Sequence, residues 1–209
     1  MAARAFTLAA EARGQVYRVC FTGGPCSGKR TAISSVRRRL NNLGFRVFTV
    51  PEAATMMFTS GAQVDDLIAD PLTFQSALLN SQLALEDTFD FLARGQAERG
   101  ISSVIVCERG AMDNKASTPP EHWQDVIEST GYQTESDLRE GRYDLVLHLV
   151  TAADGAEEFY VEDNSRGGAE ESIEEARALD RRVRECWIGH ERLHIMDNSG
   201  ANFDAKMRA

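Results

Sequence analysis

The feature that most constrains the fold is a glycine-rich heptad, GGPCSGK, at residues 23–29. It follows an apolar run typical of a buried strand and precedes a stretch whose apolar residues have helical spacing. The pattern G-x-x-x-x-G-K in this setting indicates a loop that binds nucleotide phosphates, because its N–H groups and the helix N-terminus favour anions. An incidental glycine-rich turn is the alternative. The expected site comprises Gly23, Gly24, Pro25, Cys26, Ser27, Gly28, Lys29, Arg30 and Thr31.

The residue after Lys29 departs from the usual pattern, in which a serine or threonine ligates Mg²⁺. Arg30 stands there, and Thr31 follows. In one interpretation the metal ligand is missing, so the loop binds nucleotide but turns it over slowly. In the other, the loop resembles the G-G-P-G-x-G-K-G-T run of nucleoside monophosphate kinases, where the metal is held largely through water and where glycines stand in place of Cys26 and Arg30. The residues alone leave both interpretations open.

Apolar runs alternate with helical patterns along the rest of the chain. The predicted strands are 16–22, 46–50, 103–107, 144–150 and 192–196, and the predicted helices are 28–43, one or two within 71–99, 121–130 and 172–187. This alternation predicts an α/β fold in which a parallel sheet lies between two layers of helices, because parallel strands are buried on both faces.

Charged residues follow two of the predicted strands, at the edge where parallel sheets bind ligands. Glu52 follows the second strand, and Glu108, Arg109 and Asp113 follow the third. A carboxylate there can accept a proton from an attacking hydroxyl or orient the waters of Mg²⁺, and an arginine can stabilise a transferred phosphoryl group. A first-turn helix acid and a surface ion pair are the simpler alternatives. Gln75, in the long helix, either hydrogen-bonds a base or is simply exposed.

An arginine-rich stretch follows the fourth predicted strand. Arg166 comes after a segment rich in alanine, glycine and acids, and Arg177 and Arg181 share one face of the next helix. Such a run is usually the solvated face of an amphipathic helix. Its position in a phosphate-loop domain also favours a lid, from about 154 to 188, whose arginines close over phosphates and exclude water.

Composition disfavours several other classes of protein. The 209 residues carry 23 Lys and Arg against 32 Asp and Glu, a formal charge of −9, which argues against nucleic acid as the main partner. No stretch approaches the ~18 continuous apolar residues of a membrane span. The four cysteines lack zinc-binding spacing, and reduced thiols in a cytoplasmic protein are the simplest interpretation. We expect residues 1–15 to form a flexible tail and residues 16–209 a single domain.

The order of these motifs resembles the NadR/TRPL-translocation-defect-like P-loop domain. The matching runs are CFTGGPCSGK, VFTVPEAAT, TFQSALLNSQLALE, VIVCERGAMD, LVLHLVTAADGAEEFYVEDNSR and EEARALDRRVRECWIGHERLHIMDNS. The resemblance implies a kinase-type P-loop NTPase with strand order 2-3-1-4-5 and a helical lid. The family is similar to ribosylnicotinamide kinase domains and, more loosely, to deoxynucleoside kinases. One animal branch looks like GTP-binding trafficking proteins, often with a C-terminal CYTH-like domain that is not part of these residues.

The resemblance to deoxynucleoside kinases also implies roles for single residues. It makes Glu52 the general base, Glu108 and Arg109 a Glu-Arg motif, and Gln75 the residue that recognises the base. We expect Glu108 to hold Mg²⁺ through water and Asp113 to lie near the substrate. Ser117 stands where a tyrosine is expected, which, like Arg30, marks either a neutral change or a weakened enzyme.

Three hypotheses of function follow. The first is a protein that binds ATP or GTP with the architecture of a small-molecule kinase and phosphorylates a hydroxyl of a nucleoside-like substrate. The second is a nucleotide-dependent regulatory or trafficking module with little catalysis, which acts with a protein partner. The third is a nucleotide-binding domain of a larger protein. ATP and GTP stay undistinguished, because residues 114–117 lack the aspartate of the guanine-reading sequence Asn-Lys-x-Asp.

Overall fold

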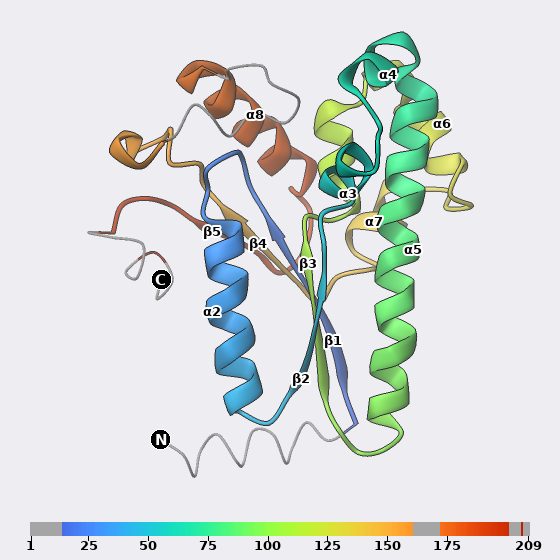
Figure 1. The fold of residues 1–209 in the computed structure, drawn as a ribbon, viewed down its shortest axis with the longest axis vertical. Coiled ribbons are helices and arrows are strands. Elements are labelled where there is room, and N and C mark those ends of the chain that lie inside the picture. The colour runs from blue at the N-terminus through green and yellow to red at the C-terminus, as the bar shows by residue number, and fades with distance from the viewer. Residues whose placement is uncertain (1–13, 161–171, 201–205, 207–209) are drawn as a thin grey trace.

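The computed structural model describes residues 14–160, 172–200 and 206. Five parallel strands form one sheet in the order β2-β3-β1-β4-β5 (Figure 1). They are β1 (Val16–Thr22), β2 (Arg46–Val50), β3 (Ser103–Glu108), β4 (Leu145–Leu149) and β5 (Leu193–Met196). This order confirms the predicted α/β/α sandwich with the strand order 2-3-1-4-5 of nucleoside and nucleotide kinases.

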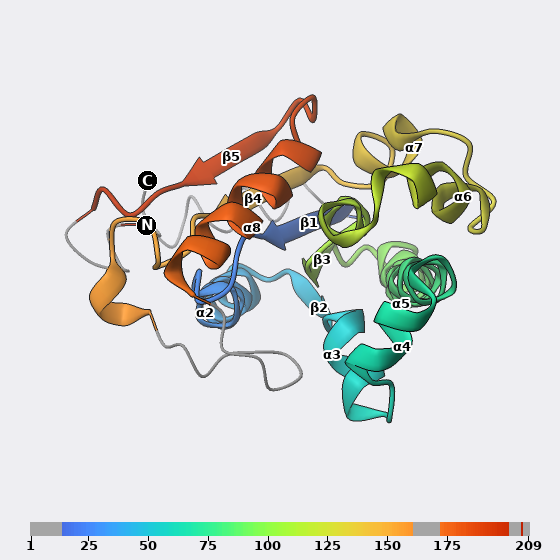
Figure 2. The same cartoon turned by 90° about the horizontal axis from the view of Figure 1, so that it is seen from above.

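Helices cover both faces of the sheet (Figure 2). They are α2 (Lys29–Asn42), α3 (Ala53–Thr59), α4 (Val64–Ala69), α5 (Pro71–Ala97), α6 (Trp123–Glu128), α7 (Glu135–Arg139) and α8 (Ile173–Cys186), with 3-10 turns η1 (Ala111–Ser117), η2 (Pro120–His122) and η3 (Glu157–Phe159). The long predicted region is one helix, α5, which begins where the Asp70 carboxylate accepts a hydrogen bond from the Thr73 amide at 3.0 Å. Helices α3, α4 and α7 have no counterpart in the sequence prediction, because each is too short to show helical periodicity.

Successive residues of each strand face opposite layers of helices. Cys20 and Ile105 belong to the core beneath α5 and α6, whereas Phe21 and Val106 belong to the core beneath α2. All four side chains are fully buried. Burial on both sides explains why these strands are continuous apolar runs in the sequence.

The carboxyl ends of the strands lie between two groups of helices. Helices α3 and α4 stand on one side, and α8 stands on the other side, above the loop between β1 and α2 (Figure 1). The start of α8 follows from its sequence, because the Ser172 hydroxyl accepts from the Glu175 amide at 3.2 Å while the Glu175 carboxylate accepts from the Ser172 amide at 2.9 Å. Within the described residues, every helix is too short or too polar to cross a bilayer.

Candidate active site at the carboxyl end of the sheet

The glycine-rich loop turns sharply between β1 and α2. Gly23 has a φ of 132°, and a Cβ atom there would lie 2.0 Å from the Leu149 carbonyl oxygen, so only glycine fits. The Lys29 ammonium folds over the loop and donates to the carbonyls of Gly23 at 3.0 Å and Gly24 at 2.7 Å and to the Ser27 hydroxyl at 3.0 Å. The loop therefore holds a positive charge within reach of an anion bound to its N–H groups.

Arg30 and Glu108 form an ion pair beside the loop. The Arg30 Nε atom donates to the Glu108 carboxylate at 3.1 Å, and the Arg30 side chain is 72% exposed. Thr31 also lines the cleft, and its side chain is exposed. The guanidinium thus contacts the very carboxylate expected to orient the waters of Mg²⁺.

A buried charge cluster lies where β2 and β3 end. The Arg109 Nε atom donates to Glu52 at 2.8 Å, and an Arg109 terminal nitrogen lies 3.6 Å from Asp113. The Thr55 hydroxyl donates to the second oxygen of Glu52 at 2.6 Å, and Glu52 is 3% exposed. Burial alone would lower the pKa of Arg109, but the charges of Asp113 and Glu52 outweigh it and raise the pKa. Arg109 therefore carries a permanent charge.

Asp113 stabilises the backbone turn in which it lies, in addition to its contact with Arg109. It accepts hydrogen bonds from the Thr22 hydroxyl and from the Gly110 amide, the latter at 2.7 Å, and is 6% exposed. Asp113 therefore links the end of β1 to η1 and orients Arg109, although it also lines the cleft. Its predicted contact with a substrate stays a prediction.

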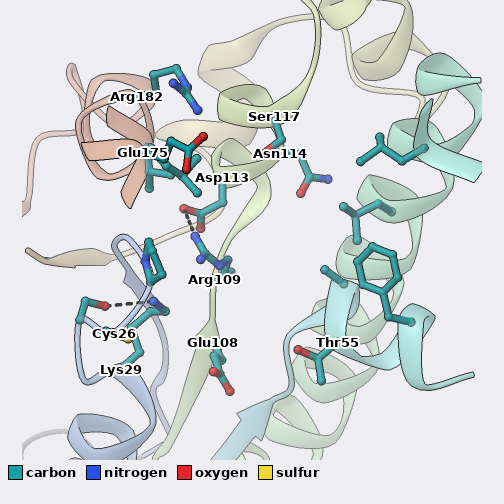
Figure 3. Close-up of a pocket in the computed structure, with 18 of the residues that line it drawn as sticks. Cys26, Lys29, Thr55, Glu108, Arg109, Asp113, Asn114, Ser117, Glu175 and Arg182 are labelled. Carbon is teal, nitrogen blue, oxygen red and sulfur yellow. Dashed lines mark hydrogen bonds and ion pairs between the residues drawn. The ribbon is translucent and has the colours of Figure 1, made fainter. Parts of the chain in front are cut away.

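Lys29, Glu108, Arg109 and Asp113 line one cleft of about 930 Å³ (Figure 3). The phosphate loop forms one end, and α8 contributes Glu175 and Arg182. Residues of α3, α4 and α5 form an apolar wall, in which the Phe58 and Phe74 rings lie 5.7 Å apart between centroids. A charged end joined to an apolar wall suits a ligand with phosphates at one end and a flat, uncharged group at the other.

Two amide side chains lie between the charged end and the apolar wall. The Gln75 Nε2 atom donates to the Ser117 carbonyl at 3.3 Å. The Gln75 Oε1 atom and the Asn114 Nδ2 atom are buried and have no hydrogen-bond partner among the described residues. Both residues line the cleft. Sequence reasoning identified Gln75 but missed Asn114, although its position one residue after Asp113 was a usable signal.

The arginines of the predicted lid have different surroundings. Arg177 donates to the Ala153 carbonyl at 2.6 Å and to Glu157 at 2.5 Å. Arg181 is exposed on α8, and neither arginine is among the residues that line the cleft. Arg182 does line it (Figure 3), and Arg166 lies outside the described residues. Closure of a lid over phosphates by these arginines stays a prediction.

The donor set bears on how a metal ion would be held. Among the described residues, no group of three or more His, Cys, Asp or Glu side chains is placed to hold one. Glu108, Asp113 and Glu175 are the carboxylates that line the cleft, and Glu108 is paired with Arg30. A carboxylate in this cleft suits the waters of a magnesium ion carried by nucleotide phosphates, and the contact of Glu108 with such an ion stays a prediction.

Comparisons with known proteins identify the family and the fold. A model of the AAA domain family matches residues 18–204, whereas no curated protein sequence matches the chain. The chain is similar in structure to deoxyadenosine kinase from M. mycoides with bound dATP, with a TM-score of 0.56, 14% identity, and coverage of 91% of this chain and 95% of that chain. At this identity the likeness shows the fold. Since the family match spans most of the chain, the protein belongs to the AAA domain family of P-loop NTPases and has the fold of a nucleoside kinase.

Proposed function

We propose that the protein binds ATP or GTP at the loop of residues 23–31 and transfers a phosphoryl group to a hydroxyl of a nucleoside-like substrate. The observation that carries this proposal is the one cleft that joins the loop, Arg109 and the apolar wall, with Glu52 bonded to Arg109 directly behind its lining. Phosphoryl transfer requires these parts within one water-excluding site, because catalysis depends on positioning and on charge stabilisation. The nucleoside-kinase fold supports the same proposal.

The apolar wall and the two amides would hold the acceptor. A heterocyclic base stacks on Phe74, and the partnerless oxygen of Gln75 accepts a hydrogen bond from its edge. Asn114, which also lines the cleft, supplies a donor. An uncharged base with both a donor and an acceptor satisfies both amides, whereas leaving a buried amide unpaired costs about 1–3 kcal/mol.

The charged cluster would carry the chemistry. The substrate hydroxyl attacks the terminal phosphorus, the new O–P bond forms, and the bond to the bridging oxygen breaks, so that the nucleoside diphosphate leaves. Glu52 accepts the hydroxyl proton, for which one of its oxygens must leave Arg109 or Thr55. Arg109 and Lys29 stabilise the charge on the transferred group.

Magnesium supplies charge neutralisation to the phosphates when it is bound with the nucleotide. Glu108 would contact its waters, in competition with Arg30. This competition also favours the second candidate function, a regulatory or trafficking module that binds nucleotide and turns it over slowly. We also propose that the protein belongs to the NadR/TRPL-translocation-defect-like branch of P-loop domains.

A product assay tests the proposal. The protein is incubated with γ-labelled ATP or GTP, Mg²⁺ and a panel of nucleosides, and labelled monophosphates are separated. We expect transfer to at least one nucleoside and its loss in Gln75→Ala, with the exposed Gln124→Ala as the matched control. Nucleotide binding without transfer to any acceptor would favour the regulatory module.

A further inference from the structure

The side chain of Asp180, on helix α8, contacts the glycine-rich loop of residues 23–29. The Asp180 Oδ1 atom accepts from the Gly24 amide at 2.6 Å and from the Thr151 amide at 3.2 Å. The Asp180 Oδ2 atom lies 3.2 Å from the Nε2 atom of His148, which is fully buried in β4. Asp180 is 4% exposed. One buried carboxylate therefore joins α8, the segment after β4 and the loop.

The glycine at position 24 is shaped by this contact. A Cβ atom on Gly24 would lie 2.8 Å from both the Cβ and the Oδ1 atoms of Asp180. Any side chain there would therefore push Asp180 away from the loop amide. The close approach of α8 therefore requires glycine at position 24, a requirement that the phosphate-loop pattern alone does not contain.

The segment after β4 reinforces the loop from the same side. The Thr151 hydroxyl donates to the Pro25 carbonyl at 2.5 Å, and the Ala152 amide donates to the Cys26 carbonyl at 3.3 Å. This segment is itself fixed by Lys206, whose ammonium donates to the Val150 carbonyl at 2.7 Å. The segment after β4 therefore supports the loop by hydrogen bonds to its carbonyls, and Lys29 bonds two further carbonyls of the same loop.

The charge state of Asp180 fits such a support. Burial alone would raise the pKa of Asp180, but the hydrogen bond and charge of His148 and the amides of Gly24 and Thr151 outweigh it, so that the pKa is lowered. An ionised carboxylate is about twice as strong an acceptor as a neutral one. Removing it would leave two buried N–H groups without their acceptor.

We propose that Asp180 is a positioning residue for nucleotide binding, which holds the phosphate loop in its binding conformation through the Gly24 amide and couples α8 to that loop. The inference rests on the proposed binding of nucleotide at the loop. Its physical reason is preorganisation: a loop that is already ordered loses less conformational freedom when its N–H groups bind phosphate. Movement of α8 on ligand binding would act directly on the loop.

A matched pair of buried carboxylates separates positioning from general stability. Asp180→Asn keeps an acceptor oxygen, and Asp180→Ala removes it. Glu86 is also fully buried, but it lies in a separate cluster with Arg142 and Tyr143. Glu86→Gln and Glu86→Ala are therefore the controls, because they remove a buried carboxylate without touching the loop.

The experiment measures Kd for ATP and for GTP by calorimetry with Mg²⁺, well below the unfolding temperature, and amide hydrogen exchange at Gly24 without nucleotide. We expect Kd to rise about tenfold in Asp180→Ala, which corresponds to about 1.4 kcal/mol, and about threefold in Asp180→Asn. Gly24 exchange should quicken in the same order. The Glu86 variants should unfold at lower temperature with unchanged Kd. If Asp180→Ala does not fold, Asp180→Asn carries the test.

Three outcomes would count against the inference. A wild-type Kd in every folded Asp180 variant would overturn it while leaving nucleotide binding intact. An equal rise in Kd in the Glu86 variants would overturn it too, because the effect would then reflect lost stability. Failure of the wild-type protein to bind either nucleotide would instead contradict the proposed function, and the inference with it.

Discussion

Two clusters of buried charge lie near opposite ends of the sheet, and they differ in what surrounds them. In the inner cluster, Glu86 accepts from Arg142 at 3.0 Å, from Tyr143 at 2.7 Å and from Gln82 at 2.9 Å. Arg142 and Tyr143 come just before β4, near the amino ends of the strands. In the cleft cluster, Glu52 accepts from Arg109, which lines the cleft.

The difference shows how one kind of interaction serves two purposes. Burial alone would lower the pKa of Arg142, but Glu86, Tyr143 and Asp87 outweigh it and raise the pKa, so Arg142 stays charged and joins α5 to the segment before β4. The cleft cluster also pairs an arginine with carboxylates, but it adjoins the glycine-rich loop and the apolar wall, where a ligand can exchange with a partner. We therefore expect substitutions in the cleft cluster to lower the rate of phosphoryl transfer and substitutions in the inner cluster to lower the free energy of unfolding.

The largest expected effect comes from Glu52→Gln. The amide keeps the shape of Glu52 but cannot take a proton, so the transfer rate should fall by roughly 10²–10⁴ while nucleotide Kd stays nearly constant. Single-turnover kinetics and calorimetry measure the two quantities. Glu86→Gln is the control, with an unchanged rate per folded molecule. If Glu52→Gln lost affinity but kept its rate, Glu52 would be structural.

Glu86→Ala should show the opposite behaviour. It leaves the buried guanidinium of Arg142 without its main partner, and breaking a buried pair costs about 3–5 kcal/mol of unfolding free energy. Urea unfolding measures the loss, and transfer assays well below the unfolding temperature should give the wild-type rate. A stable Glu86→Ala protein with impaired transfer would erase the distinction between the two clusters.

Arg30→Thr tests the ion pair between Arg30 and Glu108 in the cleft. A threonine hydroxyl can ligate Mg²⁺ at ~2.1 Å and would release Glu108 from its ion pair. Nucleotide binding should become more dependent on Mg²⁺ and turnover should rise, within about tenfold, because an exposed pair is worth about 0–1 kcal/mol. Titrations with and without EDTA measure this, with Arg38→Thr on the same helix as control. Strong Mg²⁺ dependence and fast turnover in the wild type would favour the monophosphate-kinase interpretation, with Thr31 as the working hydroxyl.

The smallest effect concerns Lys206, behind the loop. Burial lowers its pKa to about 8, although Asp180 and Asp197 act in the opposite direction. Between pH 8 and about 10.4 the unfolded chain binds more protons than the native protein, so this residue makes stability rise with pH. The unfolding free energy of wild type relative to Lys206→Met should increase by about 1 kcal/mol from pH 8 to pH 9. A constant difference across this range would contradict the lowered pKa.

Most of the fold follows from local sequence, because its signals are strong. Residues 16–22 and 46–50 were predicted as strands and are strands with these bounds, since buried parallel strands are continuous apolar runs. Helices α3 and α4, whose apolar residues pack against α5, were missed because each is too short to show helical periodicity. They nevertheless form the apolar wall of the cleft, so its shape was not predictable from the sequence.

The candidate site was likewise predictable from the sequence only in part. The loop and the meeting of Glu52 with Arg109 follow from strand order, because the carboxyl ends of β2 and β3 are adjacent. The Asp180–Gly24 contact joins residues 156 positions apart, and nothing local marks it. The same holds for the pairing of Arg30 with Glu108, which requires a tertiary structure to see.

The central claim is that the loop of residues 23–29 binds nucleotide phosphates through Lys29. The most direct measurement is the unfolding free energy of the wild type and of Lys29→Ala with and without ATP or GTP and Mg²⁺. Ligand at a hundredfold excess over Kd should stabilise the wild type by about 2.7 kcal/mol. In Lys29→Ala, affinity should fall by about one to two decades, so the gain at the same concentration should fall to about 0.4–1.4 kcal/mol. Equal stabilisation of both proteins, or none in the wild type, would contradict the claim.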